Sequence, residues 1–418
     1  MQLEIGIGTR SEAIEVADQN LMGVLMPNKV EIGLTGAEEV LRAIRNPICT
    51  APLGNVIKPG ERVVIITSDI TRPVPTWVIL PVLLDELYSA GVKPEDITLV
   101  FALGSHRFHT EEEMRKLAGD RAFSEIRCVD GNPGDVVRMG MTGRGTPVDI
   151  TRVVAEAQRR ICIGNIEYHY FAGYSGGAKA IMPGVSTREA IQSNHSRMVL
   201  PEAVAGRLEG NPVREDLEEA IKYCPIDFIV NVVLDEHKNI IRAVAGHYIE
   251  AHREGCRFLD TLYCKEIAEK ADIVIVSQGG APKDINLYQT QKALDNAKNA
   301  VKKGGIIILV GACTEGFGEG VFEKWMREAE SPDSLIERVQ REFRLGGHKA
   351  AAIALVLKNA DIYFVSEMEA ELVRSIFMHP FTSVQQALEA AFAKLGSQAT
   401  VLVMPYGGST LPTMKEKK

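Results

Sequence analysis

Three histidines and one lysine in the first half of the chain have residue types and settings that suit chemistry. His106 occurs in LGSHRFHT, and His169 occurs in NIEYHYFAGYSGGAK, each after a hydrophobic run that predicts a strand. Imidazole titrates near neutral pH, so it can take up and release protons during a reaction. Two histidines at equivalent strand ends therefore indicate an acid/base pair. Lys179 and His195 follow closely, in GGAK and SNHS.

His195 and Lys179 each leave several roles open. A neutral imidazole binds transition metals, but His195 lacks the neighbouring carboxylate or cysteine ligands of a usual site, so other donors would have to come from an organic cofactor. Lys179 suits phosphate binding, a Schiff base or an acylated attachment point. The GGAK segment lacks the GxxxxGK[ST] pattern, which argues against nucleotide triphosphate hydrolysis. We interpret the remaining histidines as surface or capping residues: His109, His237, His247, His252 and His379.

The loop that carries His169 and Lys179 is rich in glycine. Gly173, Gly176 and Gly177 allow positive φ and a close approach of the backbone to a ligand. A strand, a glycine-rich loop and a helix in succession commonly present backbone N–H groups to an anion. We therefore expect ligand binding at this loop.

Polar side chains also follow other predicted strands. Asp69 and Arg72 come after the strand Arg62–Ser68, and Gln289 and Lys292 come after the strand Ala271–Ser277. Arg and Lys bind carboxylate or phosphate groups, whereas Asp69 either accepts ribose hydroxyls or caps a turn. Gln289 and Lys292 would share one face of a helix if the chain is helical there. A solvated polar face explains that pair equally well.

The elements between these loops predict an α/β fold. Strands alternate with helices, and polar Gly/Pro loops follow the strands, which is typical of doubly wound parallel sheets. Ligands bind at the carboxyl ends of such strands. The expected strands of the first half are Leu3–Ile7, Arg62–Ser68, Ile97–Ala102, Arg160–Ile166 and a hairpin of Asp227–Leu234 with Ile240–Ala245; those of the second half are Ala271–Ser277, Gly305–Gly311, Asp361–Val365 and Thr400–Met404.

Length and composition limit the possible classes of protein. A chain of 418 residues exceeds the usual size of one hydrophobic core, so we expect two domains. The predicted boundaries are 1–264 for a cofactor-carrying N-terminal domain and 265–395 for a substrate-contacting C-terminal domain, with 396–418 returning to the first. A net charge of -8 argues against nucleic acid or an anionic membrane as partner. The absence of a signal peptide pattern or membrane-spanning run, and seven scattered cysteines, favour a cytoplasmic protein.

Five short motifs together resemble one known family. They are SDITRP, GSHR, HYFAGYSGGAK, NHS and LYQTQK, supported by NVVLDE from Asn231. With these motifs the chain resembles the nickel-dependent lactate racemase family over nearly its whole length. The resemblance implies two α/β domains with mainly parallel sheets, an active site between them, a 2-hydroxy acid substrate and enzymes that make the cofactor as partners.

The resemblance also implies a cofactor and a role for each motif residue. The cofactor would be a nickel-pincer nucleotide (nickel pyridinium-3,5-bisthiocarboxylic acid mononucleotide), in which a ring carbon and two sulfur arms hold the metal. One imidazole, His195, would complete a square-planar site, a geometry that nickel accepts. Lys179 would be the attachment point of the cofactor through a thioamide. The other implied contacts are Asp69, Ile70, Thr71 and Arg72 to the cofactor, Arg72, Gln289, Lys292 and His348 to the substrate, and His106 and His169 as the acid/base pair.

The implied reaction inverts C2 of the 2-hydroxy acid. One histidine removes the hydroxyl proton while the C2 hydride moves to the pyridinium ring, and the planar keto acid then receives the hydride on its other face. Three positions depart from the family pattern, with Ala178, Ala281 and His348 standing where larger or aromatic residues are expected. We therefore expect lactate or a larger, more polar analogue as substrate. The alternatives are a metal-dependent hydrolase or lyase with histidine ligands, and a non-catalytic nucleotide-binding protein.

Overall fold

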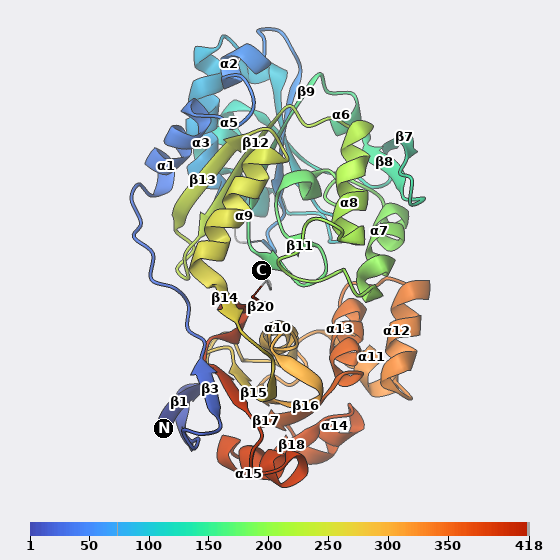
Figure 1. Ribbon diagram of the computed structural model, residues 1–418. Helices are drawn as coiled ribbons and strands as arrows, with labels where there is room; N and C mark the ends of the chain where they lie inside the picture. The colour runs from blue at the N-terminus through green and yellow to red at the C-terminus, as the bar shows by residue number, and fades with distance from the viewer. Residues whose placement is uncertain (73, 416–418) are drawn as a thin grey trace. The chain divides into compact units, whose positions relative to one another are not determined.

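Two mainly parallel sheets organise the chain, one in each of two units (Figure 1). The structure is a computed structural model that describes residues 1–72 and 74–415. The central unit comprises residues 30–260, and the terminal unit comprises residues 1–29 together with 261–418. The expected α/β fold with mainly parallel sheets is therefore confirmed.

The sheet of the central unit has the strand order β13-β12-β9-β4-β5-β6. All neighbours are parallel except β12 and β13, which form the expected antiparallel hairpin. A separate hairpin, β7–β8, lies outside this sheet. The strands are β4 (Val63–Ser68), β5 (Ile97–Ala102), β6 (Arg127–Asp130), β7 (Val136–Met141), β8 (Pro147–Thr151), β9 (Arg159–Asn165), β12 (Phe228–Leu234) and β13 (Ile240–Gly246).

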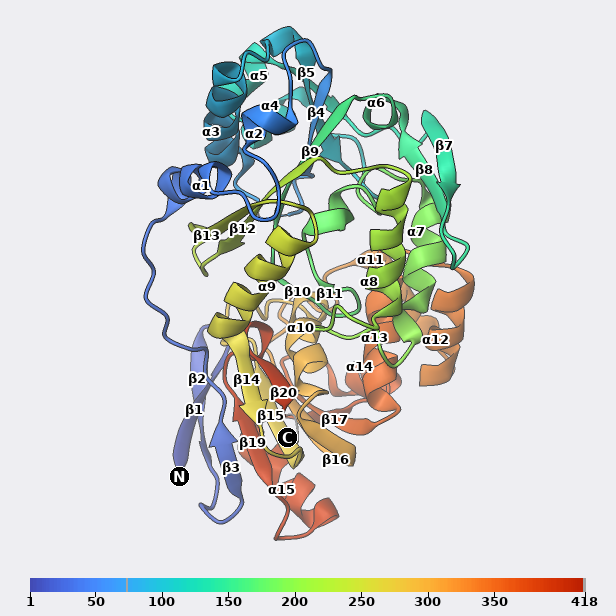
Figure 2. The same ribbon diagram turned by 45° about the horizontal axis from the view of Figure 1, so that its top comes forward.

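Alternate side chains of β4 point to opposite faces of the sheet and are buried in two different layers. Val63 and Ile65 join a buried cluster with residues of α1, α3, α4 and α5, whereas Val64 and Ile66 are buried on the other face. In both views α1 and α3 lie on the same side of the unit (Figure 2). Burying such residues on both faces explains the continuous apolar run of this strand. The helices of the unit are α1 (Gly36–Arg45), α2 (Leu53–Val56), α3 (Thr76–Ser89), α4 (Glu111–Ala118), α5 (Asp120–Glu125), α6 (Arg152–Ala155), α7 (Arg188–His195), α8 (Pro212–Glu219) and α9 (Glu250–Tyr263).

The sheet of the terminal unit is parallel throughout, in the order β18-β17-β16-β15-β19-β3. Its strands and two small added pairs are β1 (Gln2–Ile7), β2 (Arg10–Glu15), β3 (Leu21–Val24), β14 (Cys264–Ile267), β15 (Ala271–Ser277), β16 (Val301–Val310), β17 (Ala360–Val365), β18 (His379–Phe381), β19 (Val401–Met404) and β20 (Leu411–Met414). Its helices are α10 (Leu287–Ala297), α11 (Gly320–Glu328), α12 (Pro332–Arg341), α13 (Gly347–Leu357), α14 (Ala370–Ser375) and α15 (Val384–Leu395).

The division into units differs from the expected boundaries at both ends of the chain. Residues 1–29 belong to the terminal unit because β3 pairs with β19 and because Ile5, Ile7 and Ile14 lie in that unit's core. Residues after 395 stay in the same unit, where β19 pairs with β15 and β20 pairs with β14. The expected N-terminal domain of 1–264 was therefore wrong in its first segment, and the return of 396–418 to it was also wrong. Both errors concern pairings between residues far apart in sequence.

No helix in the described part of the chain has both the length and the apolar character needed to cross a membrane.

Candidate active site

Three neighbouring parallel strands of the central unit bring the predicted loops to one edge of the sheet. β4 lies between β5 and β9, with Ser68 paired to Ala102 and Ile66 paired to Cys162. Asp69 follows β4 directly, His106 follows β5, and the glycine-rich loop follows β9. Because parallel strands end at the same edge, segments almost 100 residues apart meet there.

Asp69 holds His106 in one orientation. A carboxylate oxygen of Asp69, Oδ2, accepts the Nδ1–H of His106, while its Oδ1 accepts the Thr71 hydroxyl at 2.8 Å. An ionised carboxylate only accepts hydrogen bonds, so Nδ1 of His106 carries a proton, and in the neutral imidazole the lone pair is then on Nε2. Burial by itself would raise the pKa of Asp69, but the hydrogen bond and charge of His106 lower this pKa below its ordinary value. His106 is thus arranged as a base at Nε2.

His109, interpreted from sequence as incidental, contacts the same loop. Its Nε2 accepts the backbone N–H of Ile70 at 3.1 Å, and its Nδ1 lies 2.6 Å from Oδ1 of Asp130. The side chains of His109 and Asp130 are 1% and 5% exposed. No pattern in the sequence distinguished His109 from a surface residue, because its contacts come from β6 and from the loop after β4.

Phe171 brings together the residues of the glycine-rich loop and α7. Its ring, 2% exposed, lies edge-on to His169 with ring centroids 4.5 Å apart and to His195 with centroids 5.0 Å apart. Nζ of Lys179 is 5.9 Å from the centroid of the same ring. His169, Lys179 and His195 therefore surround one aromatic side chain. Phe171 was not predicted as a site residue, although it lies two positions after His169.

Charge and burial set the protonation states in this cluster. Burial lowers the pKa of His169 well below its ordinary value, and the charges of Lys179 and Arg72 act in the same direction. Burial also lowers the pKa of Lys179 well below its ordinary value, assisted by Arg214 and Arg72. The backbone N–H of Ala172 donates to Nδ1 of His169 at 3.3 Å. Neutral His169 therefore carries its proton on Nε2, whereas His106 carries its proton on Nδ1.

A buried amide fixes the orientation of His195, the last residue of α7. Nδ2 of Asn194 donates to the backbone oxygen of Val213 at 3.1 Å and to Oδ2 of Asp216 at 2.8 Å. In this orientation, Oδ1 of Asn194 lies 2.8 Å from Nδ1 of His195. The Nδ1–H of His195 therefore donates to Asn194, and the lone pair is on Nε2. A partner on one ring nitrogen commonly orients a metal-binding histidine in this way.

Buried polar side chains fix the small hairpin β10 (Tyr168–His169) and β11 (Gly173–Tyr174). Arg214 is fully buried and donates from Nε to the backbone oxygen of Ala172 at 3.1 Å. Nδ2 of Asn211 donates to the backbone oxygen of Phe171 at 2.9 Å. Nε2 of His252 donates to the backbone oxygen of Ser175 at 2.7 Å. This loop is therefore held by side chains of α8, of its N-cap residue and of α9, and is not a free surface loop.

The glycines adopt the predicted backbone conformation, but one backbone N–H of the loop is not available to bind an anion. Gly173, Gly176 and Gly177 have φ of 76°, 75° and 60°. A Cβ on Gly173 would lie 2.0 Å from the backbone oxygen of Arg207, so only glycine fits there. The N–H of Gly177, however, donates to Oδ1 of Asn231 at 2.7 Å. That N–H therefore serves the fold and is not offered to an anion.

The predicted substrate residues of the second half lie in the terminal unit. Gln289 and Lys292 are both in α10, so they share a helix face as predicted. His348 is in α13 and is 8% exposed, and its Nδ1 accepts the backbone N–H of Gly346 at 3.0 Å. Ala178 in the central unit is 1% exposed, whereas Ala281 is exposed.

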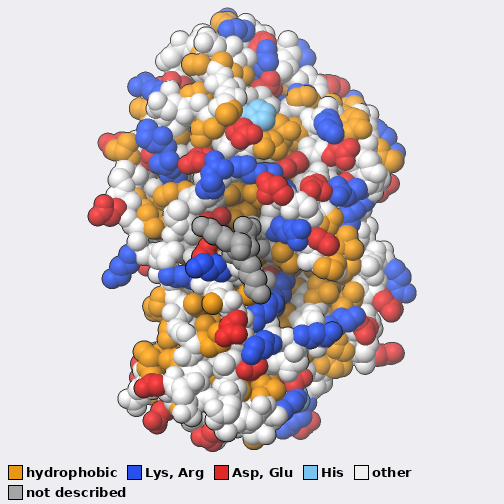
Figure 3. Space-filling view, viewed as in Figure 1, with side chains coloured by type: hydrophobic (Ala, Val, Ile, Leu, Met, Phe, Trp, Pro, Cys, Tyr) orange, Lys and Arg blue, Asp and Glu red, His pale blue; other side chains and the backbone are white. Residues whose placement is uncertain are grey.

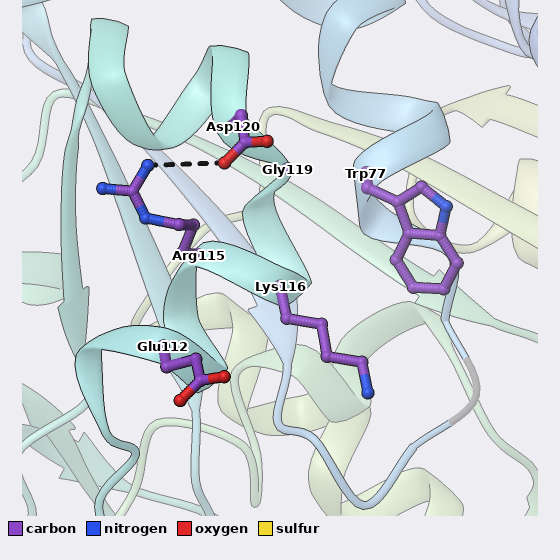
Figure 4. Close-up of a pocket in the computed structure, with 6 residues that line it drawn as sticks. All are labelled: Trp77, Glu112, Arg115, Lys116, Gly119 and Asp120. Atoms are coloured by element: carbon purple, nitrogen blue, oxygen red, sulfur yellow. Dashed lines mark hydrogen bonds and ion pairs between the residues drawn. The ribbon is translucent and has the colours of Figure 1, made fainter.

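A surface depression of about 520 Å³ in the central unit contains none of the predicted residues (Figure 4). Its lining includes Trp77, which is 49% exposed, and an ion pair of 3.3 Å between Arg115 and Asp120. On the face shown in Figure 3, acidic and basic side chains are mixed over both units. The chemically suited residues thus gather at the strand ends and not in this depression.

Comparisons with known proteins match most of the chain to one family. Residues 7–206 match the family model described as the lactate racemase N-terminal domain, and residues 267–411 match the lactate racemase C-terminal domain. The lactate racemase of Thermoanaerobacterium thermosaccharolyticum is 33% identical over 98% of both chains. The chain belongs to the lactate racemase family. The lactate racemase of Lactiplantibacillus plantarum is 32% identical over 97% of this chain and 98% of its own.

Solved structures support the same assignment. The lactate racemase apoprotein from T. thermosaccharolyticum has a TM-score of 0.87 and 32% identity, covering 99% of this chain and 100% of that one. A protein from Thermotoga maritima, 19% identical with a TM-score of 0.63 over 92% of this chain and 100% of that one, shares the fold alone. As a member of the lactate racemase family, the protein is an isomerase of the racemase class.

Proposed function

We propose that this protein inverts C2 of a 2-hydroxy acid with a nickel-pincer nucleotide as cofactor and with His106 and His169 as its acid/base pair. The observation that carries the proposal is the presence of two imidazoles with opposite proton positions after β5 and β9, the two strands that flank β4. His106 has its lone pair on Nε2, and neutral His169 has its proton on Nε2. Inversion needs one group that accepts the hydroxyl proton and another that donates to the oxygen.

The donor set of the central unit fits this cofactor. Among the described residues, no three His, Cys, Asp or Glu side chains form a group that could hold a metal ion. His195 offers one oriented nitrogen, which suits a metal whose other ligands belong to an organic molecule. Burial lowers the pKa of Lys179 well below its ordinary value, which favours the uncharged amine, and an uncharged amine is the form that acylation requires. Lys179 is thus suited to covalent attachment of the cofactor.

The residues of the central unit then divide the work around the substrate. When bound, the nucleotide supplies the acceptor and donor of the C2 hydride. His106 accepts the hydroxyl proton at Nε2, and Asp69 stabilises the imidazolium that forms. The Nε2–H of neutral His169 donates a hydrogen bond to the substrate oxygen, and the proton that His106 accepted is the one that returns to this oxygen. Arg72 follows Asp69 and is exposed at this edge, where its guanidinium suits the carboxylate of the substrate.

The terminal unit and the departures from the family pattern bear on substrate choice. Gln289 and Lys292 lie on one face of α10 and are proposed to contact the substrate, together with His348. Lactate is the substrate named for both curated relatives, and we propose lactate or a larger, more polar 2-hydroxy acid for this protein. The alternative of one metal ion bound by His106, His169 and His195 is not favoured, because these three side chains do not form a metal-binding group.

The test is an assay on protein produced together with the enzymes that make the cofactor. Each pure enantiomer of lactate, malate, 2-hydroxyglutarate and an aldonic acid is incubated with the protein, and chiral chromatography follows the other enantiomer or epimer. We expect interconversion of at least one pair, lost in His106→Ala and His169→Ala but retained in the surface variant His237→Ala. Absence of interconversion for every acid would contradict the proposal. So would full activity of protein loaded with a simple divalent metal.

A further inference from the structure

A buried imidazole links the end of β6 to the loop that carries Asp69. The N–H of Ile70, the peptide that follows Asp69, donates to Nε2 of His109 at 3.1 Å. On the other side of the ring, Oδ1 of Asp130 is 2.6 Å from Nδ1 of His109. The second carboxylate oxygen of Asp130 accepts the backbone N–H of His109 at 2.7 Å.

The partners of His109 permit only one arrangement of its protons. A backbone N–H can only donate, so Nε2 of His109 must carry the lone pair. An ionised carboxylate can only accept, so Nδ1 must carry the proton. With a proton on Nε2, two N–H groups would face each other at Ile70. Asp130 therefore selects the tautomer of His109 that can accept from Ile70.

Asp130 and His109 are held by the sheet of the central unit. Asp130 is the last residue of β6, which pairs with β5, and Asp130 itself is paired with Phe101. The ring of Phe101 lies edge-on to His109, with centroids 5.4 Å apart. Asp130 is thus part of the sheet, and His109 is packed against it. The hydrogen bond from Ile70 therefore ties the loop after β4 to this sheet.

We propose that His109 and Asp130 are positioning residues of the racemase, which rests on the proposed function. They hold the Asp69–Ile70 peptide so that the carboxylate of Asp69 meets His106. A buried His–Asp pair that only stabilised the fold would not need a neutral imidazole with its acceptor nitrogen facing Ile70. Alignment of Asp69 does need that tautomer. A shift of a reacting group by about 1 Å can cost roughly 100-fold in rate.

The kinetic test compares three variants of the cofactor-loaded enzyme. His109→Leu removes the acceptor and should lower kcat by roughly tenfold or more with little change in KM. His109→Gln places an amide oxygen where Nε2 was, and should recover most of that loss. Asp130→Asn can donate to Nδ1, which favours the wrong tautomer, and should behave like His109→Leu. His237→Leu, at an exposed turn, is the matched control and should equal wild type.

A second measurement does not depend on catalysis or on the cofactor. NMR of the ¹⁵N-histidine-labelled protein without cofactor reports which nitrogen of His109 and His106 carries the proton. We expect Nδ1–H for both in wild type, and a changed His106 signal in His109→Leu and Asp130→Asn. A proton on Nε2 of His109, or an unchanged His106 signal in both variants, would overturn the proposal. Wild-type kcat in His109→Leu would also overturn it, whereas an inactive wild type counts only against the proposed function.

Discussion

Replacing Asp69 by Asn tests the proposed base most directly. The carboxylate of Asp69 is 3% exposed and accepts from both His106 and Thr71. Asparagine keeps the shape but can place an oxygen or an NH₂ group toward His106. In either orientation the charge that stabilises a protonated His106 is lost.

The two orientations set the size of the expected effect. With the oxygen toward His106, a charge-assisted hydrogen bond of about 1.5–3 kcal/mol becomes a neutral one of about 0.5–1.5 kcal/mol. That difference of about 1–2 kcal/mol corresponds to a loss of roughly 5- to 30-fold in kcat. With the NH₂ group toward His106, the proton moves to Nε2 and the loss can approach roughly 10⁴-fold. We therefore expect kcat of Asp69→Asn to fall by at least about fivefold.

The assay measures kcat and KM for the fastest acid of the panel, with cofactor-loaded wild type, Asp69→Asn and the control Asp120→Asn. Asp120 has an exposed carboxylate, so its loss should not change kcat. Nickel content per chain must be equal in all three, so that kcat refers to loaded sites. A kcat of Asp69→Asn within about twofold of wild type would refute the assignment of Asp69 and His106.

The same variant should change the pH dependence of stability. The pKa of Asp69 is lowered in the folded state, so its ionisation contributes stability above its unfolded pKa, and this contribution is lost as pH falls through the folded pKa. Asparagine does not titrate. Wild type should therefore lose more unfolding free energy between neutral and acidic pH than Asp69→Asn. Urea denaturation at both pH values measures the free energy of unfolding of each protein. An equal loss in wild type and Asp69→Asn would contradict the contribution of Asp69 ionisation to stability.

Three further predictions concern the residues around the proposed nickel ligand and attachment point. Asn194→Ala removes the acceptor of His195 and should weaken retention of nickel by roughly 10- to 100-fold, measured as metal content after dialysis against a chelator. Lys179→Arg should abolish any covalent adduct in the intact mass, because arginine is not acylated under these conditions. Asp216→Asn should lower the free energy of unfolding by about 1–3 kcal/mol in urea titrations, since buried donors of Thr142, Asn194 and other residues lose their carboxylate.

Each of these predictions has a matched surface variant. Asn359→Ala removes an exposed amide and should leave nickel retention unchanged. Lys283→Arg replaces an exposed lysine and should leave an adduct in place. Asp235→Asn, in the exposed turn between β12 and β13, should change stability less than Asp216→Asn. Equal effects of a variant and its control would remove the role assigned to the buried residue.

The order of the elements and the general class of the fold could be predicted from local pattern. The apolar run before Asp69 predicts a strand buried on both faces, and β4 is such a strand. Positive φ at Gly173 also follows from residue type, because glycine adopts it without a steric cost. The motifs that carry His106, His169, Lys179 and His195 sufficed for the family resemblance.

Other features depend on contacts between residues distant in sequence. Residues 1–29 join the terminal unit through pairing of β3 with β19, which no local pattern indicates. His109 looked like a surface histidine until β6 placed Asp130 beside it. Proton positions on His106, His169 and His195 likewise follow from partners supplied by the fold. The sequence thus determined which chemical groups stand at the strand ends. The tertiary structure decided the tautomers of the histidines and the pKa values of Asp69, His169 and Lys179, because these depend on burial and on partners brought from distant segments.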